Sequence, residues 1–289
     1  MLKKLDMQKT NKFLLVFPYI IITLLFVVIP LILILIKSFS PATDSVTGEK
    51  LPVSDNWNFI GSTIFQKIGL SIGIAISTTL ACFIIGYLFA YFLSLTKNVS
   101  LKILAISLIT SPIWMSMLIK LVGLKTLFDF INGAPNSTYG SIFTIIALTY
   151  INLPLFILTI YTYINSIPKN LLQASKDLGK TSVQTFFYVI IPYTKTAIIS
   201  GLTLVFLPSI TTAGVTQFVN NSNDGTIIGG DILDQGLEAS TSEIALARVS
   251  SLALTTCLII LLLWSAIVLI PKTIKMIKQK RMGNKDVQI

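Results

Sequence analysis

The segment at residues 171–192, LLQASKDLGKTSVQTFFYVIIP, differs from the chain on both sides of it. It contains three charged residues, a glycine near its centre and a proline at its end, whereas long apolar runs flank it. A polar segment in such a setting is typical of a loop between two membrane helices. Whether the flanking runs cross a membrane therefore decides the fold.

The composition indicates an integral membrane protein. Hydrophobic residues make up 53% of the 289 positions and charged residues 12%, about half the charged fraction of a soluble domain. Helices rather than barrel strands are expected, because barrel strands alternate apolar and polar residues whereas these runs are unbroken. Since about 20 apolar residues span the hydrocarbon layer, six runs predict an all-α fold with six transmembrane helices at 14–36, 68–96, 103–119, 140–167, 196–223 and 249–270.

The first run begins after several lysines, as the apolar core of a signal peptide does. It is longer than the roughly 7–15 apolar residues of a signal peptide, and no A-x-A-like cleavage site follows it. We therefore interpret it as a retained helix within an N-terminal part at 1–66. The remaining spans form a predicted core at 67–271, and a basic tail follows at 272–289.

The basic residues predict the orientation. With six spans, both termini and the segment 171–192 lie on one side, which carries 16 of the 22 lysines and arginines. Cytoplasmic loops retain Lys and Arg during insertion, so both termini and this segment are expected in the cytoplasm. The net charge of +10 then reflects membrane topology, and no nucleic-acid partner is needed to explain it.

The six runs contain no Asp, Glu, Lys or Arg, and the chain has no histidine. Proton-coupled carriers place ionisable groups inside their spans, so a proton relay is not expected, although a sodium site built from carbonyls and hydroxyls stays open. Cys82 and Cys257 lie within predicted spans, where small apolar packing is their expected role. We expect no metal site.

The triplet Gly179-Lys180-Thr181 matches the end of a phosphate-binding loop. That loop requires G-x-x-x-x-G-K-[ST] after a strand, but Ala174 stands where the first glycine is needed and a predicted membrane helix precedes it. We therefore expect no ATP site, no cofactor bound by this chain and no enzymatic activity of its own.

Local signals predict two short helices in the segment. Pro168 suits a first helical turn, Gly179 suits a left-handed helix end, and Thr181-x-x-Gln184 forms a capping box that starts a second helix. Pro192 is expected to end that helix. The predicted faces are Leu171, Ala174, Ser175 and Leu178 on the first helix, and Val183, Phe186, Phe187, Ile190 and Ile191 on the second. The residues alone leave two interpretations open: a helix that docks on another protein, or an amphipathic connector on the lipid headgroups.

The spacing Gln173-Ala174-Ser175, three residues, Gly179, nine residues, Val189-x-Ile191-Pro192 resembles the EAA motif of ABC importer permeases, E-A-A-x3-G-x9-I-x-L-P. In that family the loop is a coupling helix that docks on the ATPase, so we name residues 168–192 the coupling loop. Gln173 replaces the Glu of the motif and Ser175 replaces an Ala. The resemblance implies ATPase-coupling positions at Leu171, Gln173, Ala174, Ser175, Leu178, Gly179 and Pro192.

Four further segments, at 111–128, 168–179, 198–209 and 227–235, are similar to PotB-type permease subunits of spermidine/putrescine importers. The resemblance covers roughly 69–271. It implies a type I ABC importer permease (MetI-like) fold in a bacterial cell membrane and transport of polyamines or another small solute. It also implies three partners: an ATPase dimer that binds ATP and Mg, a second homologous permease subunit and an extracytoplasmic substrate-binding protein. A stand-alone channel or secondary carrier is the alternative class.

Candidate pathway residues follow in the fifth run. Pro208 removes a backbone hydrogen bond and is expected to kink the helix. The polar residues beside it either line a water-filled path or hydrogen-bond between helices. In the external segment, Asp231 and Asp234 either attract a cation or belong to an ordinary solvated loop. The candidate pathway set is Pro208, Ser209, Thr212, Thr216 and Gln217.

Overall fold

The computed structural model describes residues 16–44, 48–132, 137–220 and 227–283, and most of these residues are helical. The chain forms two compact units. Unit 1 comprises residues 1–61 and 234–289, and unit 2 comprises residues 62–233. The last predicted span therefore groups with the N-terminal part of the chain.

Four helices are long and apolar enough to cross a membrane: Val16–Ser38, Ser62–Leu95, Tyr139–Asn165 and Glu243–Ser265. Two further pairs of helices qualify only when each bent pair counts as one span. The described residues thus contain four candidate spans, or six with both pairs. The prediction of an all-α chain with several membrane helices is confirmed.

Unit 1 is built on two helices. The π-helical turn η1 (Leu24–Val28) continues into α2 (Ile29–Ser38), which packs against α14 (Glu243–Gly283). Between them in sequence come the paired strands β1 (Ala42–Thr43) and β2 (Lys50–Leu51) and the short helix α3 (Val53–Asn58). The buried Asn56 amide donates to the carbonyl oxygens of Ser38 and Ser40, and the Ser251 hydroxyl donates to the Asn56 carbonyl. These bonds fix α3 between α2 and α14.

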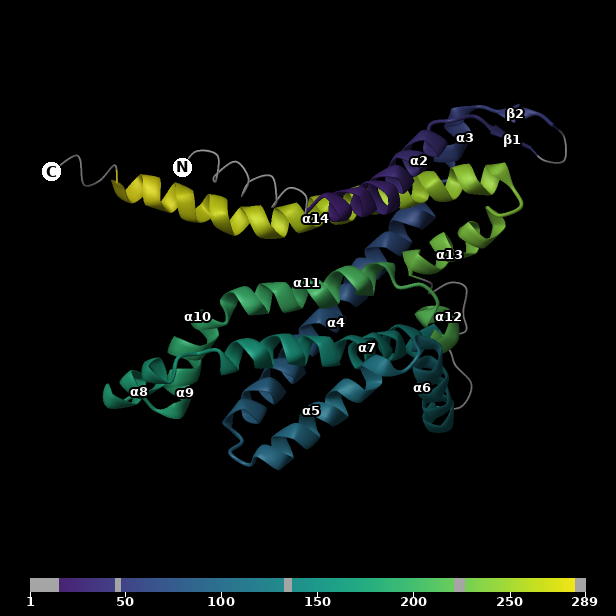
Figure 1. The fold of residues 1–289 in the computed structure, drawn as a ribbon. Coiled ribbons are helices and arrows are strands. Elements are labelled where there is room, and N and C mark those ends of the chain that lie inside the picture. The colour runs from purple at the N-terminus through teal and green to yellow at the C-terminus, as the bar shows by residue number, and fades with distance from the viewer. Residues whose placement is uncertain (1–15, 45–47, 133–136, 221–226, 284–289) are drawn as a thin grey trace. The chain divides into compact units, whose positions relative to one another are not determined.

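Unit 2 has three long helices at its centre: α4 (Ser62–Leu95), α7 (Ser137–Asn165) and α11 (Lys195–Thr211). At one end of α7 lie α8 (Lys169–Asp177), α9 (Ser182–Thr185), the π-helical turn η2 (Phe186–Ile190) and α10 (Ile191–Tyr193) (Figure 1). At the other end lie α6 (Met117–Asn132) and α12 (Val215–Asn220), and α13 (Ile228–Glu238) begins in this unit. Helix α5 (Val99–Trp114) packs beside α7.

The centre of unit 2 is organised around Phe156 of α7, which is fully buried. Its ring lies against Gly86 of α4 and Gly201 of α11, and a Cβ atom added at Gly86 would come within 2.6 Å of it. Two glycines on different helices thus make room for one aromatic ring. This arrangement lets the three helices approach one another closely.

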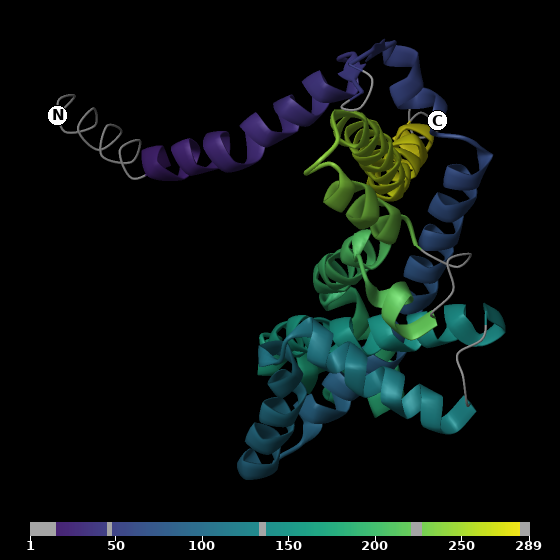
Figure 2. The same cartoon turned by 90° about the vertical axis from the view of Figure 1, so that its right-hand side faces the viewer.

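The third predicted span, 103–119, is wrong as a single helix. Helix α5 ends at Trp114, α6 begins at Met117, and the two helices meet at 102° (Figure 2). Pro112 lies in the last turn of α5. Because proline has no backbone N–H, the helix lacks one hydrogen-bond donor there. Because the run contains no charged residue, hydropathy alone predicted one span, and Pro112 was the local signal that it missed.

The fifth predicted span, 196–223, is also interrupted. Helix α11 ends at Thr211, and α12 starts at Val215 after Gly214, whose φ of +83° is left-handed. The expected kink at Pro208 is a helix end instead, because α11 continues only three residues past it. The Thr212 N–H donates to the Pro208 carbonyl at 2.8 Å and closes this last turn.

Candidate functional site

The coupling loop has the predicted helix end at Gly179. This residue has a φ of +73°, and its N–H donates to the Lys176 carbonyl at 2.8 Å. The next N–H, of Lys180, donates to the Ser175 carbonyl at 3.2 Å. These two bonds form a Schellman motif, which requires a left-handed residue at this position. The prediction of a left-handed helix end at Gly179 is confirmed.

The predicted capping box is also present at the start of α9. The Gln184 N–H donates to the Thr181 hydroxyl at 3.3 Å, and the Thr181 N–H donates to the Gln184 side-chain oxygen at 3.0 Å. Only Lys180 separates this cap from Gly179, the left-handed residue that closes α8. The angle between the two short helices is therefore set by hydrogen bonds on both sides of one residue.

The exposed face of α8 differs from the predicted face at one position. Leu171, Gln173, Ala174 and Leu178 are exposed, but Ser175 is buried. The Ser175 and Thr185 hydroxyls lie 2.9 Å apart and hydrogen-bond. Ser175 points inward because Leu172, three residues earlier on the same side, packs against the core of unit 2. It joins α8 to α9, so its side chain is not part of the exposed face of α8.

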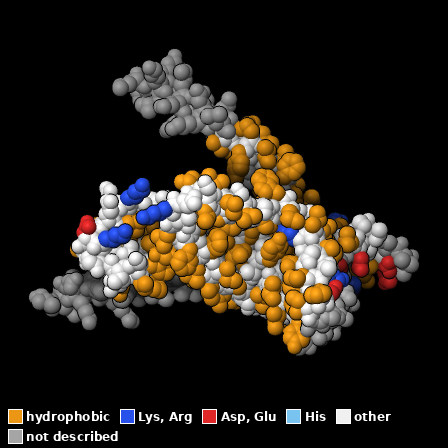
Figure 3. Space-filling model, turned by 90° about the horizontal axis from the view of Figure 1, so that it is seen from below, with side chains coloured by type: hydrophobic (Ala, Val, Ile, Leu, Met, Phe, Trp, Pro, Cys, Tyr) orange, Lys and Arg blue, Asp and Glu red, His pale blue; other side chains and the backbone are white. Residues whose placement is uncertain are grey.

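The exposed residues of α8 and its C-terminal cap combine apolar side chains with polar ones. Leu178 is 79% exposed although it is a large apolar side chain. Lys and Arg side chains gather at this end of unit 2, while hydrophobic side chains cover much of the rest of the same face (Figure 3). Leu178 and Leu171 are thus the exposed large apolar side chains on this side of the loop.

The second half of the loop is anchored in unit 2. The predicted apolar face divides in the structure. Phe186, Ile190 and Ile191 belong to or pack against the core cluster, whereas Val183 and Phe187 are exposed. Pro192 was expected to end the helix. It lies inside α10 instead, and the chain bends by 69° after Tyr193. Pro192 lies just beyond the π-helical turn η2, in a helix that runs without interruption from Ser182 to Tyr193.

The candidate pathway residues lie on both sides of the break after α11. The buried Ser209 hydroxyl accepts from the Asn152 amide of α7 at 3.3 Å and donates to the Val205 carbonyl at 2.7 Å. For Ser209, the structure thus supports hydrogen bonding between helices. Sequence analysis missed Asn152, although an amide in the middle of an apolar run was a readable signal.

The other pathway residues have different environments. Pro208 is exposed, Thr212 and Gln217 are partly buried, and Thr216 is fully buried. Among the described residues, the Thr216 hydroxyl has no hydrogen-bond partner. Because Thr216 and Gln217 belong to α12 and Pro208 belongs to α11, these residues do not share one helical stripe.

Asp231 lies in the first turn of α13 and forms an ion pair with Lys67 of α4 at 2.8 Å. In the same region the Ile228 N–H donates to the Ser71 hydroxyl at 2.9 Å. A Cβ atom at Gly229 would come within 2.5 Å of the Thr211 carbonyl oxygen. Asp231 is therefore part of a contact that holds α13 against α4, while Asp234 is exposed on the same helix.

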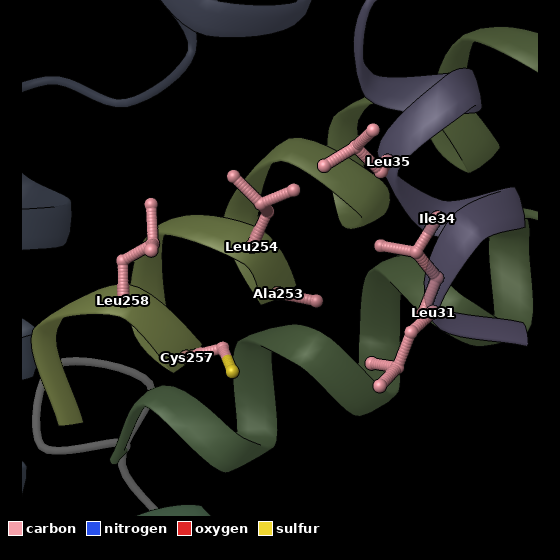
Figure 4. Close-up of a pocket in the computed structure, with 7 residues that line it drawn as sticks. All are labelled: Leu31, Ile34, Leu35, Ala253, Leu254, Cys257 and Leu258. Carbon is pink, nitrogen blue, oxygen red and sulfur yellow. The ribbon is translucent and has the colours of Figure 1, made fainter. Parts of the chain in front are cut away.

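Unit 1 contains an apolar hollow of about 390 Å³ between α2 and α14 (Figure 4). Its lining consists of Leu31, Ile34, Leu35, Ala253, Leu254, Cys257 and Leu258. None of these seven side chains is charged, so the hollow offers nothing that would hold a hydrophilic solute. The described residues also contain no cluster of His, Cys, Asp or Glu suited to a metal ion.

The family model described as a binding-protein-dependent transport system inner membrane component matches residues 82–275. A spermidine/putrescine transport system permease protein PotB homolog from Mycoplasma pneumoniae is 33% identical over 98% of this chain and 100% of that protein. The spermidine/putrescine transport system permease protein PotB of Escherichia coli is 30% identical over 87% of this chain and 96% of that protein.

Solved structures with a similar fold include a bacterial ABC transporter involved in the import of the acidic polysaccharide alginate. The TM-score is 0.65 at 15% identity, over 90% of this chain and 96% of that chain. A second structure, of a bacterial alginate ABC transporter in complex with a pentasaccharide-bound periplasmic protein, gives a TM-score of 0.67 at 14% identity. It covers 90% of this chain and 93% of that one.

Proposed function

This chain belongs to the family of inner membrane components of binding-protein-dependent transport systems, and we propose that it is the permease subunit of an ATP-driven importer for polyamines. The observation that carries this proposal is the similarity to PotB-named permeases over nearly the whole chain. In this role the chain forms part of the path of spermidine or putrescine across the membrane and performs no chemistry itself.

The coupling loop is the proposed contact with a separate ATPase dimer, which binds ATP and Mg. Two observations support this role. Leu171, Gln173, Ala174 and Leu178 form an exposed surface on α8, and the Schellman motif at Gly179 fixes the direction in which that helix ends. Lys180 lies between two helices and not at the end of a strand, so it lacks the setting of a phosphate-binding loop.

A second homologous permease subunit and an extracytoplasmic substrate-binding protein complete the proposed importer. We also propose six membrane spans with both termini in the cytoplasm of a bacterial cell. This orientation is supported by the 16 of 22 basic residues that would then lie inside, because cytoplasmic loops are enriched in Lys and Arg. It places the coupling loop on the side where ATP is available.

Uptake measurements test this proposal. Deleting the chain should abolish uptake of labelled spermidine or putrescine in cells, and restoring it should recover that uptake. Purification of the tagged chain should recover an ATPase with it. Loss of sugar or amino-acid uptake with unchanged polyamine uptake would remove the polyamine assignment. Polyamine uptake by vesicles that contain this chain alone, without ATP, would instead indicate a channel or a secondary carrier.

A further inference from the structure

The bend between α10 and α11 joins the coupling loop to a long helix at the centre of unit 2. The chain turns there by 69°, and Thr194 is the residue between the two helices. This residue is fully buried. Any change in the angle between the coupling loop and α11 therefore has to involve the contacts that Thr194 makes.

Thr194 connects the bend to α4 through a hydrogen bond. Its hydroxyl lies 2.9 Å from the Ile190 carbonyl oxygen and 2.8 Å from the Tyr87 hydroxyl. Since a carbonyl oxygen only accepts, Thr194 donates its proton to Ile190. The Tyr87 hydroxyl therefore donates to Thr194. Tyr87 is 3% exposed, so water does not compete for this bond.

Tyr87 also contacts the other end of the same short segment. The ring of Phe186, the first residue of η2, lies 5.7 Å from the Tyr87 ring and 4.6 Å from the Tyr91 ring. The Ile191 N–H donates to the Phe186 carbonyl across this wide turn. Tyr87 thus makes two contacts with this segment. Its ring packs on Phe186 at the start of η2, and its hydroxyl bonds to Thr194, four residues after the end of η2. Turns of this kind occur often at functional sites.

We propose that Tyr87 and Thr194 form a hydrogen-bonded pivot that keeps the coupling loop at a fixed angle to α4 and α11. Movement of the loop then moves both helices together. This inference rests on the proposed function, because it assumes that the ATPase acts on the loop. Tyr87 and Thr194 are positioning residues, and neither has to touch the ATPase or the solute.

The test uses the assembled importer in lipid vesicles, with solute uptake and ATP hydrolysis measured in the same preparation. Tyr87→Phe removes the hydroxyl and keeps the ring. The net contribution of one buried hydrogen bond corresponds to about a 2- to 12-fold change in an equilibrium, so solute imported per ATP hydrolysed should fall by that factor. ATP hydrolysis itself should stay within about twofold of wild type.

Tyr91→Phe is the matched control. It makes the same chemical change beside the same Phe186 ring, and the structure gives the Tyr91 hydroxyl no hydrogen bond among the described residues. Its ratio of uptake to hydrolysis should be unchanged. Thr194→Ser, which keeps a hydroxyl, should preserve the ratio, whereas Thr194→Val should lower it. Adding Tyr87→Phe to Thr194→Val should cause no further loss, because Thr194→Val already removes the acceptor of the Tyr87 hydrogen bond.

Several results would overturn the pivot. These are an unchanged ratio in Tyr87→Phe, an equal loss in Tyr91→Phe, additive losses in the double variant, or loss of ATPase binding by Tyr87→Phe, which would indicate a merely structural role. Failure of the proposed function is distinguishable, since the wild-type chain would then show no ATP-dependent uptake at all.

Discussion

The two ends of unit 2 differ in what holds them. At one end, the coupling loop is shaped by bonds between neighbours in sequence, such as those of Gly179 and of the Thr181 capping box. At the other end, the start of α13 is held by residues far apart in the chain, with Lys67 paired to Asp231 and Ser71 bonded to the Ile228 N–H. Local hydrogen bonds can be recognised in a sequence, whereas contacts between residues so distant in the chain cannot.

The largest expected effect is at the start of α13, the end of unit 2 that long-range contacts hold in place. Gly229→Ala places a Cβ atom 2.5 Å from the Thr211 carbonyl oxygen, and backbone atoms cannot move aside cheaply. Overpacking of this kind typically costs about 1–3 kcal/mol. We expect a lower unfolding temperature of the purified protein and a strong loss of solute uptake.

Gly236→Ala is the control for this substitution. Gly236 lies in the same helix α13, and a Cβ atom there meets nothing within 4 Å. The substitution should raise stability slightly, because alanine favours the helix by roughly 1 kcal/mol over glycine. Equal stability of the Gly229→Ala and Gly236→Ala variants would show that α13 does not rest on the end of α11.

The next largest effect is in the coupling loop, which hydrogen bonds between sequence neighbours hold in place. Gly179→Val puts a β-branched residue at a φ of +73°, which costs about 1–2 kcal/mol. Helix α8 should then leave the loop at a different angle, so uptake and ATP hydrolysis should become uncoupled while the protein still reaches the membrane. The measurement is uptake per ATP hydrolysed, together with the amount of protein in the membrane.

Gly179→Asn provides a graded control, because asparagine tolerates left-handed backbone better than other residues. It should fall between wild type and Gly179→Val. If Gly179→Val imports solute normally and stimulates ATP hydrolysis normally, the loop is an ordinary connector on the lipid headgroups.

The same contrast explains how much of the molecule could be predicted. The helical class, the Gly179 helix end and the Thr181 capping box follow from residue type and spacing, and the structure contains them. The 102° turn after Trp114 and the break before Val215 were missed. Both lie in sequence without charged residues, where hydropathy continues across the break, although Pro112 and Gly214 were local signals of a helix end.

The site shows a similar division. The exposed positions of α8 were predicted from helical periodicity, but the burial of Ser175 depends on Thr185 and on how Leu172 packs. Tyr87 and Asn152 were missed because their roles depend on partners 107 and 57 positions away. A hydroxyl or amide within an apolar run signals that a partner exists, but it does not identify that partner.

A smaller effect separates a structural role of Asp231 from a role in attracting cations. Lys67→Met should destabilise the protein by about 1 kcal/mol. The ion pair is partly buried, so the cost of breaking it should fall between that of an exposed pair and that of a fully buried pair. Exchanging the two charges, with Lys67→Asp and Asp231→Lys together, should restore part of the stability and of the uptake. Thermal unfolding and uptake should be measured on the single and the double variants. Restored stability with uptake still lost would mean that the Asp231 carboxylate itself acts on the cationic solute.

The smallest effect concerns Ser209, for which sequence allowed two roles. Its hydroxyl accepts from the Asn152 amide within the packed helices, and such bonds between membrane helices contribute about 0.6 kcal/mol on average. Ser209→Ala should therefore lower stability by roughly that amount and leave the KM for uptake unchanged. Ser200→Ala, at an exposed position of the same helix α11, should change stability less. A raised KM in Ser209→Ala with unchanged stability would mean that Ser209 faces the solute, and the end of α11 would then belong to the pathway rather than to the packing between helices.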